Sequence, residues 1–563
     1  NFRNFEEILY ISFCNLNIMR VRSRENLKKK NIAITGLFLL PIIGFGSYAG
    51  IILMIVTDIS SYSRDEMEAP NVDFFFDEDS IDEAILEDLA HHYDWQIEKY
   101  HMPANISVNV DFESQNYENV KSYHGTDNGQ LHIAYTIAAN CLRFKWAVEN
   151  NRDDLVKNAT RVLTKLITAL KNSLAAPNGG FGINPETGDY YPGTLARFVV
   201  PPGYQDIHPF MYEDHVRHFN GTGPYKNWRV RLYTSRDELG GFYLSTASVL
   251  KFIDPDYNKE CEWIVDTVKT AVAQLIEGFR DTNWLLLGGN GEPVGSDLNP
   301  ILEGSTWQLG LLRIGATAYP ERYETLYNYI ASKMLSMGSA SMGSVHNTVE
   351  GYYAFSFGLD VMLALIWLED NQNLKYHYIS NYENNFYRIV RYHRNNFFNI
   401  AHLIFMTMLE EDQRAEFQNP DYKDEKILWD FKDQLWRFYK SGWAEGIRNY
   451  NLTQRPHSTR ATSTHPGLRE KKRDPTKKKW RDFFETSVFG NLFSWIEVEF
   501  DFDQESENYI LPLRVSEYGI HHWLWEHNKL DDDGGTPNGD GLTQAAPNSY
   551  ICTYWMAKAY NII

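Results

Sequence analysis

Apolar residues recur along the chain in six segments that carry small and hydrophobic side chains around most of a helical circumference. Each segment begins with polar or glycine-containing residues, as in "YTSRDELGGFYLSTASVLKFI" at 233–253. A helix that is apolar on all sides is typical of the interior of a protein. We therefore expect buried helices at residues 123–144, 233–253, 302–319, 346–368, 392–409 and 547–560.

Six amphipathic segments alternate with these buried ones. In "RDDLVKNATRVLTKLITALKNSL" at 152–174 the apolar residues follow the spacing of a single helical stripe, and similar segments lie at 80–100, 258–279, 321–335, 374–392 and 425–443. Six inner and six outer helices predict a mainly α fold, an (α/α)6 toroid over residues 80–563. An irregular helical solenoid is the alternative. Because strand-like segments are few, we expect the glycine-rich insertions to be loops at the mouth of the ring.

The amino-terminal region has the pattern of a single-pass membrane anchor. Residues 31–57 carry no charge over a length that spans a bilayer. A basic tail at 1–30 precedes them and an acidic linker at 58–79 follows, so we expect a cytoplasmic amino terminus and an extracellular main domain. A cleaved signal peptide is the alternative, but the apolar stretch is long and lacks a clear cleavage site. A start at Met19 would leave residues 1–18 untranslated.

Composition narrows the function classes. The formal net charge of −20 lacks the basic surface of a nucleic-acid-binding protein, so we exclude nucleic acid as a partner. Aromatic residues make up 15%, a share that suits both ordinary packing and stacking on sugar rings. The four cysteines are far apart, and we expect buried free thiols rather than a zinc site. Extracellular sequons predict glycosylation at Asn105, Asn158, Asn220 and Asn451.

The polar starts of the inner helices are expected to converge on one end of the ring. Glycoside hydrolysis needs two carboxyl groups that flank one bond. Our preferred pair is Asp127 with Asp237, with Glu238 or Glu350 as a substitute, although helix amino termini also favour carboxylates as simple caps. The substrate-binding residues expected on the same rim are His124, Asn128, Arg236, Trp307, Gln308, His346, Arg394 and Asn548.

Three segments carry a family resemblance: "GTDNGQLHIAYTIAANCLRFKWAVENNRDDLVKNATRVLTKLITAL", "TSRDELGGFYLSTASVLKFI" and "PNSYICTYWMAKAYNII". Their short motifs resemble the (α/α)6 superfamily of glycosidases and polysaccharide lyases, which includes unsaturated glucuronyl hydrolases. Within it the chain is most like uncharacterised surface proteins. The resemblance covers residues 80–563 as architecture. It implies acid chemistry on the inner-helix rim, where Asp127 and Asp237 match the glucuronyl hydrolase aspartates by position alone.

Other segments give weaker signals. Asp531, Asp533 and Asp540 offer oxygen ligands for calcium, but "LDDDGGTPNGDG" departs from the EF-hand pattern and a flexible loop is the simpler interpretation. We expect no other cofactor. The basic run at 457–482 is expected to be a solvated loop, or a contact for anionic glycans, lipid headgroups or a protein partner. In the long connection that follows residue 174, Tyr190, Tyr191 and Arg197 are expected to line the cleft.

The predicted function is therefore a membrane-anchored extracellular glycoside hydrolase that acts on a polysaccharide. One alternative is a non-catalytic cell-surface protein that binds glycan or builds an assembly with the same fold. A second is a uronate lyase or epimerase, for which Tyr123, His124 or His346 would supply a base. Carboxyls separated by about 5 to 10 Å across an open cleft would favour hydrolysis. Acids locked in ion pairs would favour the binding role.

Overall fold

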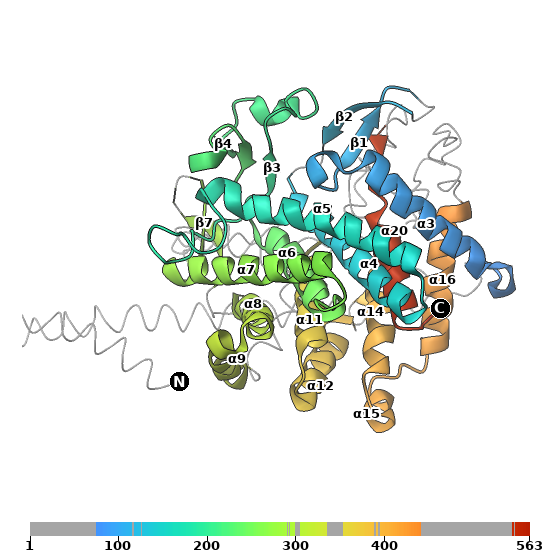
Figure 1. Cartoon of the computed structure of the whole chain (residues 1–563). Coiled ribbons are helices and arrows are strands. Elements are labelled where there is room, and N and C mark those ends of the chain that lie inside the picture. Colours follow the sequence, from blue (N-terminus) through green and yellow to red (C-terminus); the bar gives the residue numbers. More distant parts are fainter. Residues whose placement is uncertain are drawn as a thin grey trace, which may run out of the picture. The chain divides into compact units, whose positions relative to one another are not determined.

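The computed structural model describes residues 75–114, 118–124, 127–289, 291, 293–298, 304–334, 353–387, 390–391, 395–440, 543–544 and 546–563. All of them belong to the second of two compact units, which covers residues 59–563. This described part contains thirteen α-helices and only short strands (Figure 1). The mainly α fold predicted from the hydrophobic pattern is thereby confirmed.

Six helices are buried on nearly all sides, as their apolar composition predicts. They are α4 (Gly129–Glu149), α6 (Arg236–Phe252), α8 (Gly304–Ala318), α11 (Tyr353–Leu368), α14 (Asn396–Thr407) and α20 (Asn548–Ala559). The interior of α4 illustrates the pattern, because every residue from Gly129 to Phe144 is buried.

Amphipathic helices cover the buried ones. They are α3 (Glu83–Tyr100), α5 (Asp153–Asn178), α7 (Lys259–Asp281), α9 (Pro320–Met334), α12 (Gln372–Asn381) and α16 (Asp424–Lys440). A short helix, α15 (Glu411–Ala415), lies between α14 and α16. The segment predicted as one helix at 374–392 is divided, because α12 passes into a π-helix, η7 (Tyr382–Tyr387).

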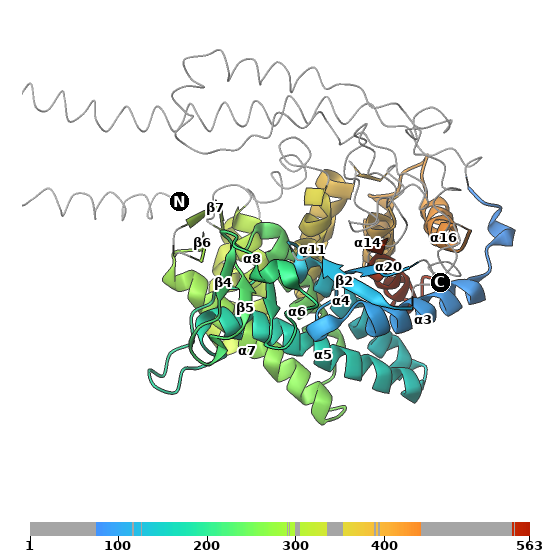
Figure 2. The same cartoon turned by 90° about the horizontal axis from the view of Figure 1, so that it is seen from above.

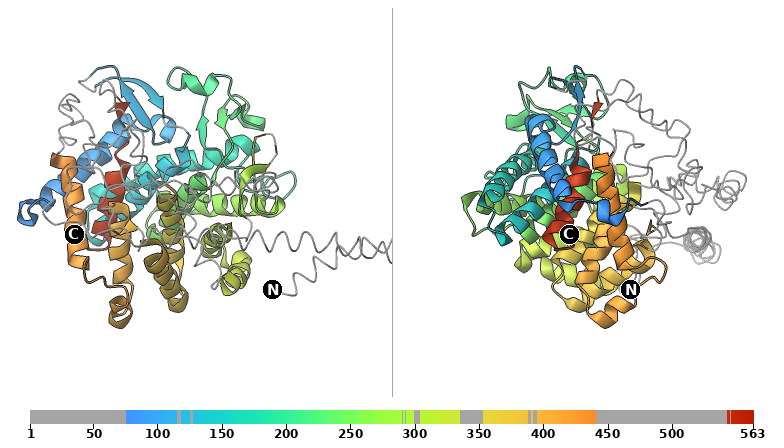
Figure 3. Two further views of the ribbon diagram at one scale, coloured as in Figure 1. Left: turned by 180° about the vertical axis from the view of Figure 1, so that it is seen from behind. Right: turned by 90° about the vertical axis from the view of Figure 1, so that its right-hand side faces the viewer.

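Each buried helix packs against the amphipathic helix that is paired with it, and α8 also contacts α7. The pairs are α4 with α5, α6 with α7, α8 with α9, α11 with α12, α14 with α16 and α20 with α3. The buried helices also pack on one another: α4 contacts α6 and α20, α11 contacts α6, α8 and α14, and α14 contacts α20. The views from above and from behind show α5 beside α7 and α3 beside α20 (Figures 2 and 3).

A glycine allows the closest approach between α4 and α6. A Cβ atom at Gly241 would lie 2.5 Å from the backbone oxygen of Gln130 and 2.6 Å from the Cα atom of Leu131. Real Cβ atoms are not found at such distances, so a larger residue would push the two helices apart. The glycine therefore fixes how the starts of α4 and α6 sit beside each other.

Short antiparallel strands occupy segments that the sequence pattern led us to expect as loops. One sheet has the order β2–β1–β8, from Val120–His124, Asn109–Phe112 and Thr543–Gln544. A second has the order β3–β5–β4, from Phe198–Val200, Arg229–Arg231 and His218–Asn220, with Phe198 opposite Arg231. Strands β6 (Leu285–Leu287) and β7 (Pro293–Asp297) form a hairpin. Single 3-10 turns occur at Glu78–Ser80, Pro103–Asn105, Pro209–Tyr212 and Gly223–Tyr225.

The predicted membrane anchor at 31–57 lies outside the described residues. Among the helices that the structure does describe, none combines the length and the apolar character needed to cross a bilayer. Cys141, Cys261 and Cys552 are buried free thiols, as expected.

Candidate functional site

The starts of α4 and α6 bring together two of the predicted acidic residues. Asp127 lies two residues before α4, and Asp237 lies in the first turn of α6. Strands β3 and β5 run past this point and place Arg197 and Arg231 beside the two helix starts. Asp127, Asp237, Arg197, Arg231 and Glu238 are called the carboxylate–arginine cluster below.

Arg197 links the two helix starts. Its Nε donates to the backbone oxygen of Tyr233 at 2.6 Å, one terminal nitrogen donates to the backbone oxygen of Asp127, and the other donates to the Ser235 hydroxyl at 2.7 Å. The Ser235 hydroxyl in turn donates to the Asp237 carboxylate. The guanidinium, on a residue only 8% exposed, therefore connects segments that are distant in sequence through one planar group.

The Asp127 carboxylate is accessible and paired with cations. Its side chain is 59% exposed and accepts from buried Arg231 and, at 3.4 Å, from the half-exposed Arg217. The other terminal nitrogen of Arg231 lies 3.2 Å from the Nε2 atom of His218. Burial lowers the pKa of Arg231, and the Asp127 charge opposes that shift.

Glu238 lies beside this site but is fully buried. Its Oε2 atom accepts from the backbone N–H of Gln130 at 2.8 Å, so a carboxyl of α6 caps the first turn of α4. The Gln130 side chain donates to Ser173 at 2.8 Å and to the Ala196 carbonyl at 3.0 Å, which ties the same turn to α5 and to the segment before β3. Burial raises the pKa of Glu238 well above its ordinary value, although the Arg197 charge opposes the shift. We therefore assign Glu238 a positioning role.

Other predicted site residues lie in the core. Trp307 is fully buried against Tyr243 and Phe357, and Gln308 is 5% exposed. Asn548 is also buried and donates to the backbone oxygen of His132 at 3.0 Å. These three side chains pack the helix interfaces and, in the described structure, present no surface to a ligand.

Several predicted residues lie near the cluster or on the surface. Asn128 is the residue before α4, and Arg236 is the first residue of α6; both are half-buried. Among the predicted glycosylation sites, Asn220 is exposed, Asn105 is half-buried with a φ of 67°, and Asn158 accepts from Arg143 at 2.7 Å.

The remaining predicted residues fall elsewhere in the chain. Glu350, His346, Arg394, Asn451, Asp531, Asp533 and Asp540 lie outside the described residues, as does the side chain of His124. Within the described ranges, no group of three or more metal-ligating side chains is present.

The arginine partners of Asp127 were missed in the sequence. Arg217 and Arg231 lie in "HVRHFN" and "NWRVRLY", where the second segment alternates arginine with apolar residues. That alternation is the signal of a half-buried strand and could have placed Arg229 and Arg231 on one face. We did not recognise this strand pattern because the surrounding sequence is rich in glycine and was interpreted as a loop.

A second buried charged cluster joins α14, η7 and α16. The His402 ring bonds the Glu383 carboxylate at 2.9 Å and the Asp424 carboxylate at 3.3 Å, and it stacks on Tyr387 at 4.5 Å between ring centroids. The side chains of His402 and Glu383 are each 3% exposed. Burial acts to lower the pKa of His402, but the two carboxylates outweigh it and raise the pKa to about 9. This cluster is a charged link between the helices.

Comparisons with known proteins did not identify a protein related to this chain. No family model matches the chain, and neither the curated proteins nor the solved structures gave a significant match.

Proposed function

We propose that the chain is a membrane-anchored extracellular carbohydrate-active enzyme, a glycoside hydrolase whose main domain is an (α/α)6 toroid. The contacts support the toroid, because successive buried helices pack on one another and the last of them, α20, packs on α4 and α3 from the beginning of the described chain. The charge-free segment at 31–57 between basic and acidic flanks supports the anchor.

The link between Asp127 and Asp237 is the observation that carries the proposed chemistry. Arg197 and Ser235 join the two residues across 110 positions of sequence, at the starts of adjacent helices. Two carboxyl groups around one glycosidic bond are the requirement for acid-assisted hydrolysis. One of the two aspartates would act as the proton donor and the other as the base or nucleophile. Arg217 is positioned to bind an acidic sugar.

Glu238 supports this pair without reaching the substrate. Its neutral form, favoured by burial, adds no second negative charge beside Asp237. Its bond to the N–H of Gln130 fixes α4 against α6. We therefore expect Glu238 to set the geometry of the two aspartates.

One specific observation favours the alternative function, a non-catalytic surface protein that binds glycan. Asp127 is held by Arg231 and Arg217, and a carboxylate locked in ion pairs suits a surface that binds glycan without cleaving it. A different observation bears on a lyase or epimerase, which needs a base: the ring of Tyr123, a candidate base, lies 5.5 Å from the ring of the buried His208. Burial raises the pKa of Tyr123, which weakens that residue as a base.

A polysaccharide screen separates these functions. The full chain would be incubated with a panel that includes uronate-rich polymers, and new reducing ends and the absorbance of unsaturated products would be read together. Hydrolysis predicts reducing ends without unsaturation, lost in Asp127→Asn and Asp237→Asn but retained in Asp256→Asn, a control on an exposed turn. Unsaturated product would instead indicate a lyase. Binding without turnover by the folded protein would indicate the non-catalytic role.

A further inference from the structure

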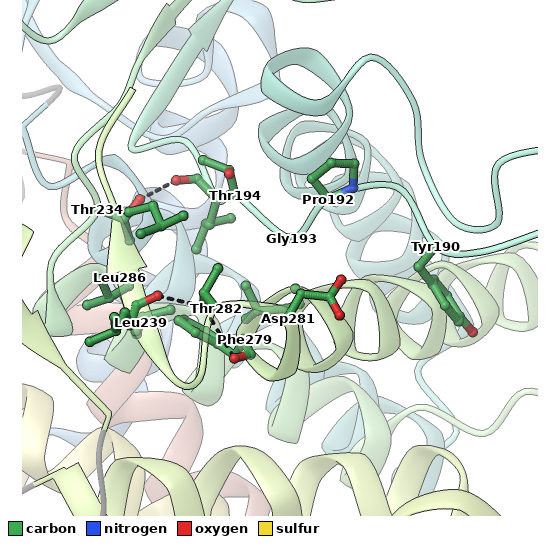
Figure 4. A pocket seen from close by; sticks show the side chains of 15 residues that line it. Tyr190, Pro192, Gly193, Thr194, Thr234, Leu239, Phe279, Asp281, Thr282 and Leu286 are labelled. Atoms are coloured by element: carbon green, nitrogen blue, oxygen red, sulfur yellow. Dashed lines mark hydrogen bonds between the residues drawn. The ribbon is translucent and has the colours of Figure 1, made fainter. Parts of the chain in front are cut away.

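A cavity of about 300 Å³ lies between the start of α6, the end of α7, the β6 strand and the connection at 190–195 (Figure 4). Its volume is at the lower end of the range for small-molecule sites. The carboxylate–arginine cluster contributes none of its five residues to the lining. The cavity is therefore lined by other residues than the cluster, although Thr234 is next in sequence to Ser235, and the inference about its ligand does not rest on the proposed hydrolase activity.

Close backbone packing builds one wall of this cavity. A Cβ atom at Gly193 would lie 2.7 Å from the backbone oxygen of Gln274 and 2.9 Å from the Cα atom of Gly278. The absence of side chains at these two glycines lets the 190–195 connection lie directly on α7. A wall held by such a contact is part of the fold, so the cavity is a preformed space.

The floor of the cavity is apolar. It is lined by five leucine and phenylalanine side chains that are all less than 6% exposed, namely Leu195, Leu239, Leu275, Phe279 and Leu286. Such a floor favours a ligand with an apolar body, because contact with it removes hydrocarbon surface from water. A free sugar, with hydroxyl groups on most of its carbons, would leave these surfaces poorly matched.

Five polar side chains line the cavity, and three of them, Thr234, Thr282 and Asp281, offer only acceptors to a ligand; the other two are Tyr190 and Thr194. The Thr234 hydroxyl already donates to the Leu195 carbonyl, and the Thr282 hydroxyl donates to the Leu285 carbonyl at 2.8 Å. Each hydroxyl therefore has only lone pairs left for a ligand. Asp281 adds a carboxylate to the lining, which Figure 4 shows on the side of α7 that faces Pro192. No ion pair of the Asp281 side chain occurs with the residues that the structure describes.

An acceptor-rich rim over an apolar floor selects the charge of the ligand. Asp281 would repel an anion, whereas an ammonium group has the donors that its carboxylate and the lone pairs of the two threonine hydroxyls accept. We propose that this cavity is a binding site for a small organic ammonium compound, a single cationic head on a compact apolar body.

Phenethylammonium and phenethyl alcohol form a matched pair of probes, because they share the apolar body and differ in the charged group. Binding of each to the full chain would be measured by calorimetry and by saturation-transfer NMR. We expect saturable binding of phenethylammonium and weaker binding of the alcohol. Asp281→Asn should weaken the ammonium roughly three- to fivefold, the range of a partly exposed ion pair. The alcohol should be unaffected.

Three further variants locate the binding. Asp266→Asn removes an exposed aspartate of the same helix that does not line the cavity, and it should change nothing. Leu287→Trp places a large ring at the half-buried edge of the cavity and should abolish binding of both probes; Thr194→Phe tests the same point from the opposite wall should the first variant unfold. The proposal is overturned if folded protein binds neither probe, if the filled cavity binds both as before, or if Asp281→Asn leaves the ammonium affinity unchanged.

Discussion

The stability of the domain should fall with increasing pH because of one buried histidine. The pKa of His402 is raised from 6.5 to about 9 by Glu383 and Asp424, which outweigh the opposing effect of burial. A raised folded-state pKa means that the folded chain binds the His402 proton more tightly than the unfolded chain does. Its contribution to stability is complete below about pH 6.5 and is lost as pH rises through 9.

The magnitude follows from the difference between these two pKa values. At about 1.4 kcal/mol for each pH unit, the charged cluster contributes about 3 kcal/mol that disappears between pH 6.5 and 9. His101 and His208 do not interfere, since burial lowers the pKa of each to about 4. The stacked Tyr387 does not interfere either, because burial raises its pKa well above 10.

Urea unfolding at several pH values, followed by fluorescence, measures this effect. Wild-type protein should lose about 3 kcal/mol of unfolding free energy across the interval because of His402, whereas His402→Gln should be less stable at neutral pH and should lose this contribution to the decline. The two curves should converge above pH 9. His377→Gln, at a half-buried position of α12, should parallel wild type. A wild-type stability that is constant or rises over this interval would refute the reasoning, as would a decline of the same size in His402→Gln.

Three other sites give predictions that the same unfolding assays check. Burial raises the pKa of Glu238 above 4.5, so the stabilising contribution of its neutral form declines as pH rises through the folded-state pKa. Glu238→Gln should therefore be at least as stable as wild type near pH 8, whereas Glu238→Ala should be less stable. A destabilised Glu238→Gln variant would contradict this. Gly241→Ala should cost about 1–3 kcal/mol, since its Cβ atom would lie 2.5 Å from a backbone oxygen of α4. In Gly240→Ala the nearest atom would be a side-chain carbon at 3.0 Å, so the steric cost should be smaller; equal costs would contradict the packing account. Wild type should lose stability as pH falls from 6.5 toward 4, because His101 and His208 are buried in neutral form, and His101→Gln should reduce that loss.

The helices could be predicted because burial leaves a periodic pattern in the sequence. The stretch at 233–253 contains α6 from Arg236 to Phe252, and the stripe at 152–174 is continued by α5 to Asn178. The pattern failed at 374–392, where the switch from α12 to η7 changes the hydrogen bonding without changing the residue types. It failed again for β3 and β4, because strands of three residues are too short to show an alternation, and the alternation around β5 was overlooked.

The candidate site could be predicted only in part. The positions of Asp127 and Asp237 followed from the polar starts of apolar helices. The cap that Glu238 provides could not be foreseen, because its partner Gln130 lies 108 residues away on another helix. Trp307 was expected at the rim but is buried, since an aromatic residue in an apolar helix fits either place and tertiary packing decides.

The most direct test of the proposed chemistry is a double-mutant cycle on kcat/KM with whichever polysaccharide the chain cleaves. Asp127→Asn, Asp237→Asn and the double variant would be compared with wild type, after circular dichroism shows that all four are folded. If the two aspartates act on one bond as a unit, each single variant should lose most of the activity and the double variant little more. Single variants that keep the activity of wild type, or losses that simply add, would contradict a shared catalytic role for Asp127 and Asp237.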